Sequence, residues 1–588
     1  MGAQSQSETL RVPVLVVGAG PAGLAASLLL QSYGTHALTV TKHRWTSHTP
    51  RAHHINPRAM ELLRQLQLED EVTERAMPRD LIRNVVWCRS LAGEEIGRIA
   101  TYHHGGPGTY TGLTPCEALN IPQHRFEPVL AEALLARGGE LLFNTECVSI
   151  TQDSQRVRAR LHNRVTGAST VVESDYLIGA DGASSLVARE IGLELAGQAG
   201  WGEAVNIWLR ADLTRFCAHR PGVLYWTHQP GNDFWIGSGV FIAVEPWNEW
   251  VVTLMHDPTA GKVDLSPDTL RRRIHHIIGD DGIELELRSI SKWQMNAQYA
   301  TRYSNGRVFC TGDAVHRHPP SNGLGANTSM LDARNLAWKL KLVLDGTASP
   351  DLLQTYDRER QPIGRATIER SMKSVGEFAT VASALGYTSG QTPADGERAL
   401  LTLRDPGPTG QAARLRLAQA IDLQRYQFAA VGFELGYRYR EGALAPADAE
   451  ERVSNDPDLI YLPDTAPGCH LPHAWVTSSG RRISTLDLLD GTRFLLLTGC
   501  GGECWQRAAR EIRNALGLEV TVVGIGPGLQ IEDPYGDWRR IRGVDDDGGV
   551  LVRPDGHVAW RTGSATSSAA QSLVPFLGRL LGRTSSTR

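Results

Sequence analysis

Two features that would point to large partners are missing from this sequence: a long apolar run and a block of like charge. No apolar stretch approaches the roughly 20 residues of a membrane-spanning helix, so the sequence predicts no membrane segment. Lys and Arg total 60 against 64 Asp and Glu, and neither sign gathers in a long block. Charges mixed in this way argue against nucleic acid or a membrane surface as a partner. A small molecule is the partner that remains.

Closely spaced cysteine pairs are missing as well. The 8 cysteines are scattered, and none has CxxC spacing; Cys500 and Cys504 are one residue too far apart for a thioredoxin-type redox pair. Scattered thiols are typical of a reducing compartment. The first residues have neither the apolar core of a signal peptide nor a serine or threonine at position 6 for myristoylation. These absences predict a cytoplasmic protein.

The 588 residues are enough for three or four units of about 150 residues. Residues 12–17 form a β-branched apolar run, a helix is expected over 22–33, and a second such run covers 37–41, which predicts a βαβ unit. Further along, residues 205–296 are rich in strand patterns, with a helix near 270–278. A strand over 307–313 and a long helix over 328–344 follow, and the stretches rich in turn residues near 388–396 and 445–458 are predicted linkers. The fold class expected is α/β, or α+β overall, with a small α/β unit after residue 468.

A glycine-rich turn links the first strand to its helix. Gly18, Gly20 and Gly23 match GxGxxG, with Pro21 and Ala22 inside the motif. Such glycines allow a tight turn, and the N–H groups of the helix N-terminus can hold a pyrophosphate. The alternative is a turn that only packs strand on helix.

The acid that usually follows the second strand of a dinucleotide fold is absent, because residues 40–44 read VTKHR. Thr41 can still bond a hydroxyl, and Lys42 or Arg44 can cover the adenosine side.

Two later turns carry acids beside glycines. Asp181 and Gly182 end the apolar strand of YLIGADG, and Asp313 stands in RVFCTGDAVHRHPPSNGLGANT. Asp313 is a candidate for the ribitol hydroxyls of a flavin. The backbone of Gly323, Leu324 and Gly325 can lie flat against a ring system where side chains would collide.

The order of these three motifs resembles the para-hydroxybenzoate hydroxylase superfamily, the group A flavoprotein aromatic monooxygenases, over about residues 10–380. The segments PRAHHINPRAMELLR, SLAGEEIGRI, GDAVHRHPPSNGLGANTS and HLPHAWV are similar to the branch with 2,4-dichlorophenol hydroxylase and 2-hydroxybiphenyl monooxygenase. The resemblance implies a Rossmann-like FAD-binding domain over 10–200 and 296–385 and a β-sheet substrate domain over 201–295. A helical or linker segment over 386–460 and a thioredoxin-like domain over 461–588 complete the implied order.

The resemblance also implies the ligands and the residues that hold them. FAD is the expected cofactor, NADPH or NADH the co-substrate, O2 and a small aromatic compound the substrates, and a homodimer the expected assembly. Contacts to the cofactor are expected from Gly18, Gly20, Pro21, Ala22, Gly23, Thr41, Lys42, Arg51, Gln123, Asp181, Gly182, Asp313, Pro320, Gly323, Leu324, Gly325, Ala326 and Asn327.

His53 is the candidate for handling a phenolic proton, since imidazole titrates near neutral pH. The alternative is a histidine that only packs locally. Relatives carry an acid in the segment that matches 118–123, where this chain has Asn120. His316 and His318 invite a metal interpretation, but HRH beside two prolines is more simply a shaped loop, and no metal is expected. Contacts to the aromatic substrate are expected from Asn120, Trp226, Trp293 and Pro319.

The resemblance therefore implies an FAD-dependent, NAD(P)H-consuming monooxygenase that hydroxylates a phenolic or related aromatic ring through a flavin C4a-hydroperoxide. Epoxidation or Baeyer–Villiger insertion on a natural product is the alternative within the same chemistry. A non-catalytic FAD-binding module is the alternative of another class. A flavoprotein disulfide reductase is disfavoured because no CxxC follows the first glycine motif.

Overall fold

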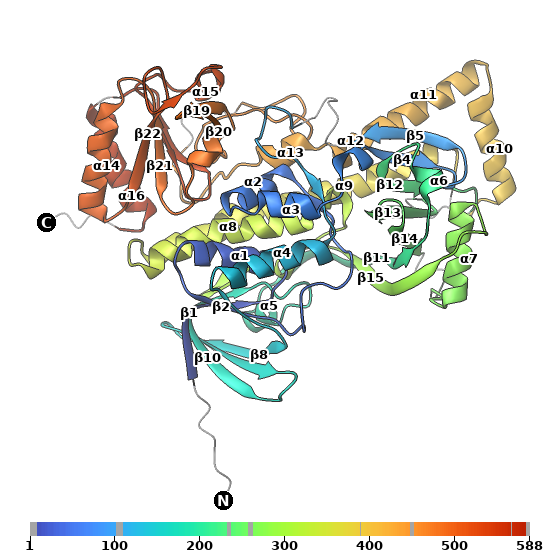
Figure 1. The fold of residues 1–588 in the computed structure, drawn as a ribbon, viewed down its shortest axis with the longest axis horizontal. Helices are drawn as coiled ribbons and strands as arrows, with labels where there is room; N and C mark the ends of the chain where they lie inside the picture. Colours follow the sequence, from blue (N-terminus) through green and yellow to red (C-terminus); the bar gives the residue numbers. More distant parts are fainter. Residues whose placement is uncertain are drawn as a thin grey trace, which may run out of the picture.

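The computed structural model describes residues 9–101, 110–231, 237–256, 261, 263–388, 390–446, 452–565 and 567–583. Two eight-stranded sheets lie at either end of a pair of long helices, and a third group of strands and helices follows near the C-terminus (Figure 1). The mixed α/β class predicted from the sequence is confirmed. Within the described residues, no helix combines the length and the apolar character needed to cross a membrane.

The first sheet holds the predicted βαβ unit. Its parallel strands follow the order β17-β10-β1-β2-β7, and β1 is buried from Val14 onward because its apolar residues have neighbours on both faces. Helices α1, α4 and α8 lie on one face of this sheet (Figure 1). The elements are β1 (Thr9–Val17), α1 (Pro21–Ser32), β2 (Ala37–Val40), α4 (Gln123–Ala136), β7 (Glu140–Leu142), β8 (Thr145–Gln152), β9 (Val157–Asn163), β10 (Ser169–Gly179), α5 (Leu186–Glu190), β16 (Ser304–Asn305), β17 (Val308–Cys310) and α8 (Gly325–Leu344).

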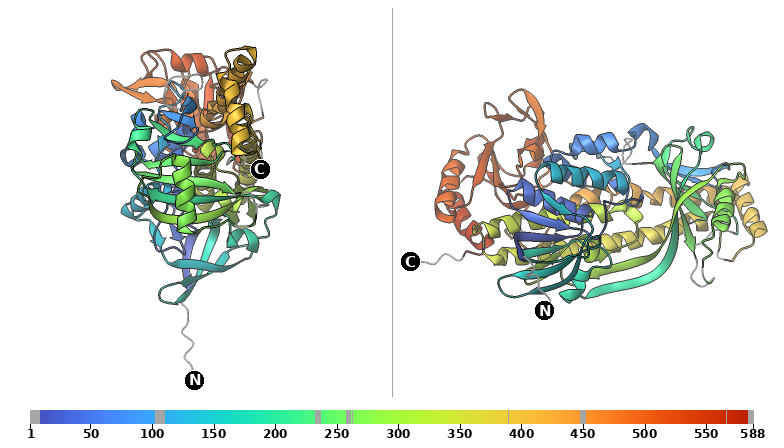
Figure 2. Two further views of the ribbon diagram at one scale, coloured as in Figure 1. Left: turned by 90° about the vertical axis from the view of Figure 1, so that its right-hand side faces the viewer. Right: turned by 60° about the horizontal axis from the view of Figure 1, so that its bottom comes forward.

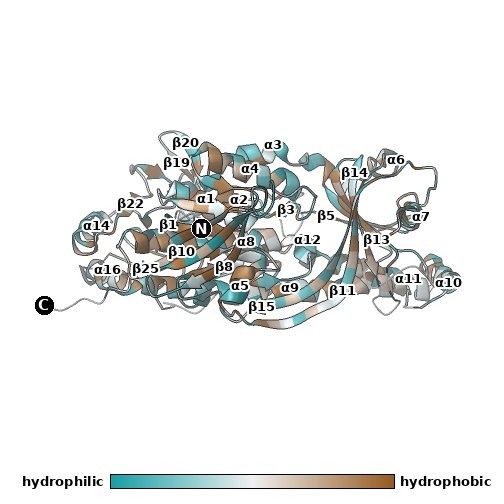
Figure 3. Cartoon of the chain, turned by 90° about the horizontal axis from the view of Figure 1, so that it is seen from below, coloured by the Kyte–Doolittle hydropathy of each residue, from teal (hydrophilic) through white to brown (hydrophobic). Residues whose placement is uncertain are grey.

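The second sheet has the order β18-β15-β11-β14-β13-β12-β4-β5. Its two longest strands, β11 and β15, extend from the first sheet to the far end of the molecule (Figures 2 and 3). Helix α7 packs its apolar stripe against one face. The elements are β4 (Asn84–Cys88), β5 (Glu95–Ala100), β11 (Leu195–Arg210), β12 (Gly222–Thr227), β13 (Gly239–Glu245), β14 (Glu249–His256), α7 (Pro267–Ile278), β15 (Glu286–Ala300) and β18 (His316–Arg317).

The β-rich segment predicted over 201–295 thus forms most of this second sheet. Strands β4 and β5 join it from a part of the chain that the prediction gave to the flavin domain, and β4 pairs with β12 in parallel. Two short strands, β3 (His54–Ile55) and β6 (Leu119–Asn120), pair with each other in a separate two-stranded sheet. The domain boundaries themselves stay a prediction.

A run of helices follows the second sheet. The predicted linker near 388–396 is wrong at its end, because Thr392 caps a helix that begins at Pro393. The Thr392 hydroxyl accepts from the N–H of Asp395, and proline is favoured in a first turn. The other predicted linker, 445–458, lies partly outside the described residues. The helices are α9 (Thr355–Ala384), α10 (Pro393–Arg404), α11 (Pro408–Leu423), α12 (Arg425–Phe428) and α13 (Val431–Gly436).

The C-terminal unit has a four-stranded sheet in the order β22-β21-β24-β25, with β21 and β22 parallel and the other pairs antiparallel. Helices α14 and α16 pack against each other beside it (Figure 1). Its thioredoxin-like identity stays a prediction. The elements are β21 (Phe494–Thr498), α14 (Glu503–Leu516), β22 (Val520–Gly524), β24 (Gly549–Val552), β25 (Val558–Thr562) and α16 (Ser567–Leu580).

A buried ionic network ties this C-terminal unit to α8 and α9. The Glu359 carboxylate on α9 accepts from Lys339 on α8 at 2.8 Å and from both terminal nitrogens of Arg553 at 2.7 and 2.8 Å. Arg553 also pairs with Asp555. All four side chains are at most 2 % exposed. Because each charge has a partner, their burial is compensated within the folded chain.

Candidate active site

The three turns that carry the glycine motif, Asp181 and Asp313 meet at the carboxyl edge of the first sheet. β1, β10 and β17 are neighbours and parallel, so the turns that follow them lie side by side. A Cβ atom on Gly18 would collide with the Ala180 carbonyl, and a Cβ on Gly312 would come within 3.4 Å of the Ala22 side chain. The glycine motif, the Asp181 turn and the Asp313 turn therefore form one rim.

The glycine motif has the shape that a pyrophosphate requires. Gly18 has φ +111°, and a Cβ on Gly23 would collide with the Gly18 carbonyl oxygen, so both positions need glycine. Gly20 has ordinary extended backbone angles, and its nearest neighbour in the direction of a Cβ is a Glu127 oxygen at 3.9 Å. The space beside Gly20 is thus open within the chain itself. Helix α1 begins there with Pro21 and Ala22 and directs its first N–H groups at that space.

The end of β2 is a positively charged edge. Thr41 is buried and is held by backbone hydrogen bonds to Leu142 and Thr145, whereas Lys42 and Arg51 are exposed. Burial and then the charges of Lys42 and Arg51 lower the pKa of His43. This edge therefore favours an anion.

Gln123 begins α4 and is oriented by a buried acid that the sequence analysis missed. Its amide Nε2 donates to Glu127 Oε1 at 2.5 Å, and Glu127 Oε2 accepts from the N–H of Ser47 at 2.6 Å. Burial raises the pKa of Glu127, and the two hydrogen bonds partly offset this effect. This bond uses one of the two amide hydrogens of Gln123 and fixes the orientation of its side chain.

The Asp181 carboxylate is engaged in local structure. Oδ1 accepts from the Ser185 hydroxyl at 2.5 Å, and Oδ2 accepts from the N–H groups of Leu186 and Val187 at 2.7 and 3.2 Å. It thus caps α5, and Gly182 turns away with φ +81°. The direct contact of Asp181 with a cofactor stays a prediction, and it would form in addition to these hydrogen bonds.

Asp313 is exposed on a short turn, and Asp332 of α8 stabilises that turn through hydrogen bonds. The buried Asp332 carboxylate accepts from the N–H of Gly312 at 3.1 Å, from Arg360 Nε at 2.7 Å, and bonds to His316 Nε2 at 2.8 Å. Nearby charges of Arg360 and His316 hold the pKa of Asp332 down against desolvation, which raises it. His316 is therefore a support for the Asp313 turn.

The loop after β18 is built from unusual backbone. Asn322 and Gly323 have φ +64° and +61°, and a Cβ on Gly323 would lie 3.0 Å from the His54 side chain. The Asn327 amide donates to the carbonyls of Gly323 and His54 at 2.7 and 3.0 Å and accepts from the N–H of Asn56 at 3.0 Å. Asn327 thus holds the loop against the segment that carries His53. The loop runs from buried Pro319 and exposed Pro320 into the first residues of α8: Leu324 as its N-cap, then Gly325 and Ala326.

His53 directly precedes β3, and its side chain meets that of Asn120, whose register partner across β3 and β6 is His54. His53 Nδ1 is 2.5 Å from Asn120 Oδ1, and Asn120 Nδ2 points at the sulfur of Met77 at 2.6 Å. Because an amide oxygen only accepts, Nδ1 carries the proton and Nε2 of a neutral ring keeps its lone pair. Burial lowers the pKa of His53 below 6.5, although the Asn120 bond opposes this. At neutral pH the ring is thus a base with a defined tautomer.

Comparison with known proteins agrees with this geometry. The family model for an FAD binding domain matches residues 11–371, and that for the C-terminal region of aromatic-ring hydroxylases matches residues 464–584. The chain is 44 % identical to 2,4-dichlorophenol 6-monooxygenase of Cupriavidus pinatubonensis, over 98 % of this chain and 97 % of that one. It is 38 % identical to phenol 2-monooxygenase of a Pseudomonas species, over 97 % and 93 %.

Among solved structures, the flavin-dependent monooxygenase PieE, in complex with FAD and substrate, superimposes with a TM-score of 0.94 at 44 % identity, covering 98 % of this chain and 100 % of that one. The chain belongs to the FAD-dependent aromatic-ring hydroxylases. The predicted family, FAD as the cofactor and NAD(P)H as the reductant are confirmed. The glycine turn, with its open space at Gly20 and helix N-terminus, fits the pyrophosphate of that cofactor.

The two predicted substrate tryptophans lie on one face of the second sheet. Trp226 pairs with Val240, Val240 with Thr253, and Thr253 with Asn206 across neighbouring strands. Trp293 lies two residues beyond the partner of Asn206 on β15 and donates from Nε1 to the Asn206 side chain at 3.0 Å. Cross-strand partners share a face, so this series defines one wall.

That wall faces the flavin rim. His124, next to Gln123 on α4, has its ring 5.7 Å from Trp208, which shares the face of Asn206. Phe378 on α9 lies 4.5 Å from the Trp226 ring. The Trp226 indole N–H is buried and has no hydrogen-bond partner among the residues that the structure describes. It is therefore available to a bound ligand.

Sequence reasoning missed Glu127, Asp332 and Phe378. Glu127 stands four residues after Gln123 on one helix, and this spacing was a usable signal. Asp332 and Phe378 gave none, because they reach the site only through the packing of α8 and α9.

A buried acid behind the Gly323 loop makes stability depend on pH. Glu434 on α13 accepts from the Tyr110 hydroxyl, and its other oxygen lies 4.0 Å from His54 Nε2. Burial raises its pKa from 4.5 to about 8, although the Tyr110 bond lowers it. Between those values the folded state holds a proton that the unfolded state has released, so the free energy of unfolding falls as pH rises.

We expect Glu434→Gln to remove this pH dependence, since glutamine stays neutral and still accepts from Tyr110. The difference in melting temperature between variant and wild type should move in favour of the variant from about pH 5 to about pH 8. Thermal melts across that range measure it. Glu369→Gln, in an exposed pair with Arg365, is the control and should give a flat difference. A flat difference for Glu434→Gln as well would contradict the assignment.

Proposed function

We propose that this enzyme hydroxylates a phenol carrying apolar substituents, and that His53 takes the phenolic proton. The single observation that carries the proposal is the part-buried His53–Asn120 pair, which leaves a neutral Nε2 on the segment that Asn327 ties to the Gly323 loop. Similar chains are named for action on phenol and on 2,4-dichlorophenol, which supports a substituted phenol as the substrate class. Ionising the hydroxyl makes the ring carbon beside it a stronger nucleophile.

FAD, when bound and reduced, supplies the activated oxygen. We propose that the α1 N-terminus with Gly18, Gly20 and Gly23 holds its pyrophosphate, Thr41, Lys42 and Arg51 its adenosine side, and Asp313 its ribitol. The backbone of Gly323, Leu324 and Gly325 would then lie against its ring. The chain's own contribution to the reaction is to hold the phenol against that loop, to exclude water with the apolar wall of the second sheet, and to accept the proton at His53.

The proposal is tested by measuring NAD(P)H oxidation and product formation across substituted phenols. A phenol should accelerate flavin reduction, and the product should gain one oxygen atom from ¹⁸O₂ at the carbon beside the hydroxyl. NAD(P)H oxidation that yields only hydrogen peroxide for every phenol would overturn the substrate class. An epoxide or a ring-inserted product would assign the alternative oxygen transfer.

Trp226 gives a second test of where the phenol lies. Trp226→Phe keeps an aromatic ring against Phe378 but removes the unpaired N–H. We expect KM for the phenol to rise about threefold to tenfold, the value of about one hydrogen bond, with a smaller change in kcat. Trp250→Phe is the control, because Trp250 is on the opposite face and donates to the backbone carbonyls of Ala211 and Trp247. A rise in KM for the control alone would remove Trp226 from the site.

A further inference from the structure

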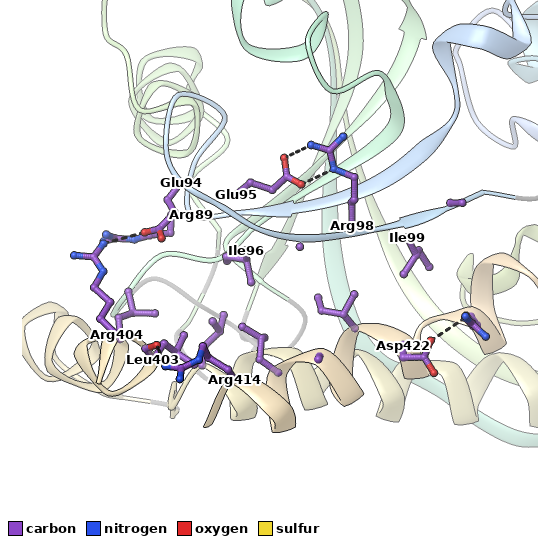
Figure 4. A pocket seen from close by; sticks show the side chains of 18 of the residues that line it. Arg89, Glu94, Glu95, Ile96, Arg98, Ile99, Leu403, Arg404, Arg414 and Asp422 are labelled. Carbon is purple, nitrogen blue, oxygen red and sulfur yellow. Dashed lines mark hydrogen bonds and ion pairs between the residues drawn. The ribbon is translucent and has the colours of Figure 1, made fainter. Parts of the chain in front are cut away.

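A cavity lies at the edge of the second sheet, beside β5. It has a volume of 720 Å³ and lies between β5 and the α10–α11 hairpin (Figure 4). That volume is within the range of about 300–1,000 Å³ that small-molecule sites occupy. None of its lining residues belongs to the proposed cofactor or substrate site. Its apolar surface comes mainly from Ile96, Ile99, Leu400, Leu403, Leu417 and Ile421.

The charges around the cavity leave one guanidinium without a carboxylate. Five arginines and three carboxylates line it, which gives a net charge of +2, and Glu397 outside the lining reduces this to +1 by pairing with Arg89. Among the described residues, Arg414 has no acidic partner. Its Nη1 donates to the backbone carbonyls of Leu403 and Asp405 at 2.8 Å each. These bonds hold Arg414 at the cavity while Nη2 keeps its hydrogens for another acceptor.

Two ion pairs connect the walls of the cavity at one end. Arg89 and Glu94 come from the turn between β4 and β5, and they pair with Glu397 and Arg404 of α10. Figure 4 shows the isoleucines of β5 above α11, with Arg414 at the helix side. A cavity closed at one end by such bridges admits a small molecule more readily than a protein segment.

We propose that this cavity binds an amphipathic organic anion, with its apolar body between β5 and α11 and its carboxylate or sulfonate on Arg414. Aliphatic side chains on both walls favour the body by removing it from water. A charge-assisted hydrogen bond to a guanidinium held in place favours the head group. The proposal does not depend on the function proposed for the flavin site.

The test uses two probes that differ only in charge: 8-anilinonaphthalene-1-sulfonate and neutral N-phenyl-1-naphthylamine. Each is titrated calorimetrically into FAD-loaded enzyme that is saturated with a phenol, so that the active site is filled. Ala418→Trp fills the cavity from an exposed position on α11, and Arg414→Glu reverses the charge of its anchor. Arg416→Glu is the matched control, since it lies on the same helix, is exposed and does not line the cavity.

Wild type and Arg416→Glu should bind one equivalent of the sulfonate. Arg414→Glu should bind it about tenfold more weakly and the neutral probe unchanged, and Ala418→Trp should lose both probes. Identical titrations for wild type and Ala418→Trp would overturn the site. Equal weakening of both probes by Arg414→Glu would overturn the anionic class. If wild type binds neither probe, its mass is measured by light scattering and compared with that of Ala418→Trp. A lower mass for Ala418→Trp would show instead that a second copy of the chain covers the cavity.

Discussion

Replacing His53 by alanine should lower kcat/KM for a phenol by about 10²- to 10⁴-fold, the usual contribution of a positioned general base. The physical reason is that the variant lacks the neutral Nε2 that we propose as the acceptor of the phenolic proton. FAD content and the rate of flavin reduction without substrate should stay near those of wild type. Steady-state kinetics with a substituted phenol, followed by product analysis, measures the effect. An unchanged kcat/KM would reduce His53 to a packing residue.

Asn120→Asp keeps the hydrogen bond that orients His53 but adds a charge beside its ring. A carboxylate at position 120 would still hold Nδ1 of His53, but its charge would raise the pKa of the ring. Since catalysis requires the neutral ring, the acidic limb of the profile of kcat/KM against pH should move to higher pH. Asn120→Leu should lower kcat/KM without that displacement, because it removes the bond and adds no charge. Superimposable profiles for wild type and Asn120→Asp would exclude a titrating role for His53.

Gly20→Ala should weaken FAD binding by about 10²- to 10⁴-fold while the apoprotein remains folded. The backbone at Gly20 suits alanine, and a methyl group there would meet no protein atom closer than 3.9 Å. It would occupy the space offered to the pyrophosphate, which removes two charge-assisted hydrogen bonds worth about 1.5–3 kcal/mol each. Titration of apoprotein with FAD, read by flavin fluorescence, gives the dissociation constant.

Two further glycines calibrate this result. Gly563→Ala, at an open and exposed position, should leave both FAD affinity and melting temperature unchanged. Gly23→Ala should lower both, because its Cβ would collide with the Gly18 carbonyl oxygen. Equal FAD affinity for Gly20→Ala and wild type would place the pyrophosphate elsewhere.

The sequence was sufficient where function depends on local pattern. GxGxxG fixed the position of the first turn to the residue, because strand, turn and helix are consecutive and need glycine at Gly18 and Gly23 for backbone reasons. The positions of the Asp181 and Asp313 turns followed in the same way from the apolar strands before them. The role of His53 stays a prediction, and the structure adds the Asn120 bond that defines its tautomer.

The remaining features depend on packing between distant segments, which no local pattern reveals. Asp332 lies in the middle of a long helix, and only the folded chain shows that it supports the Gly312 turn. The contact of Asp181 with a cofactor stays a prediction, and only the structure shows that its oxygens also cap α5, since a strand-to-helix turn offers a carboxylate two nearby N–H groups. The start of α10 was read as a linker because TSGQTP is rich in turn residues, although Thr392 and Pro393 are also typical of a helix start.

The ion network between α8, α9 and the C-terminal unit has a consequence for engineering. Ending the chain before residue 461 would remove Arg553 and expose to water the Glu359–Lys339 pair, whose lysine lies on α8, the helix that begins at the flavin loop. The C-terminal unit therefore stabilises the flavin end of the molecule. Exchanging this unit between relatives should give a folded protein only when the hybrid keeps both Glu359 and Arg553.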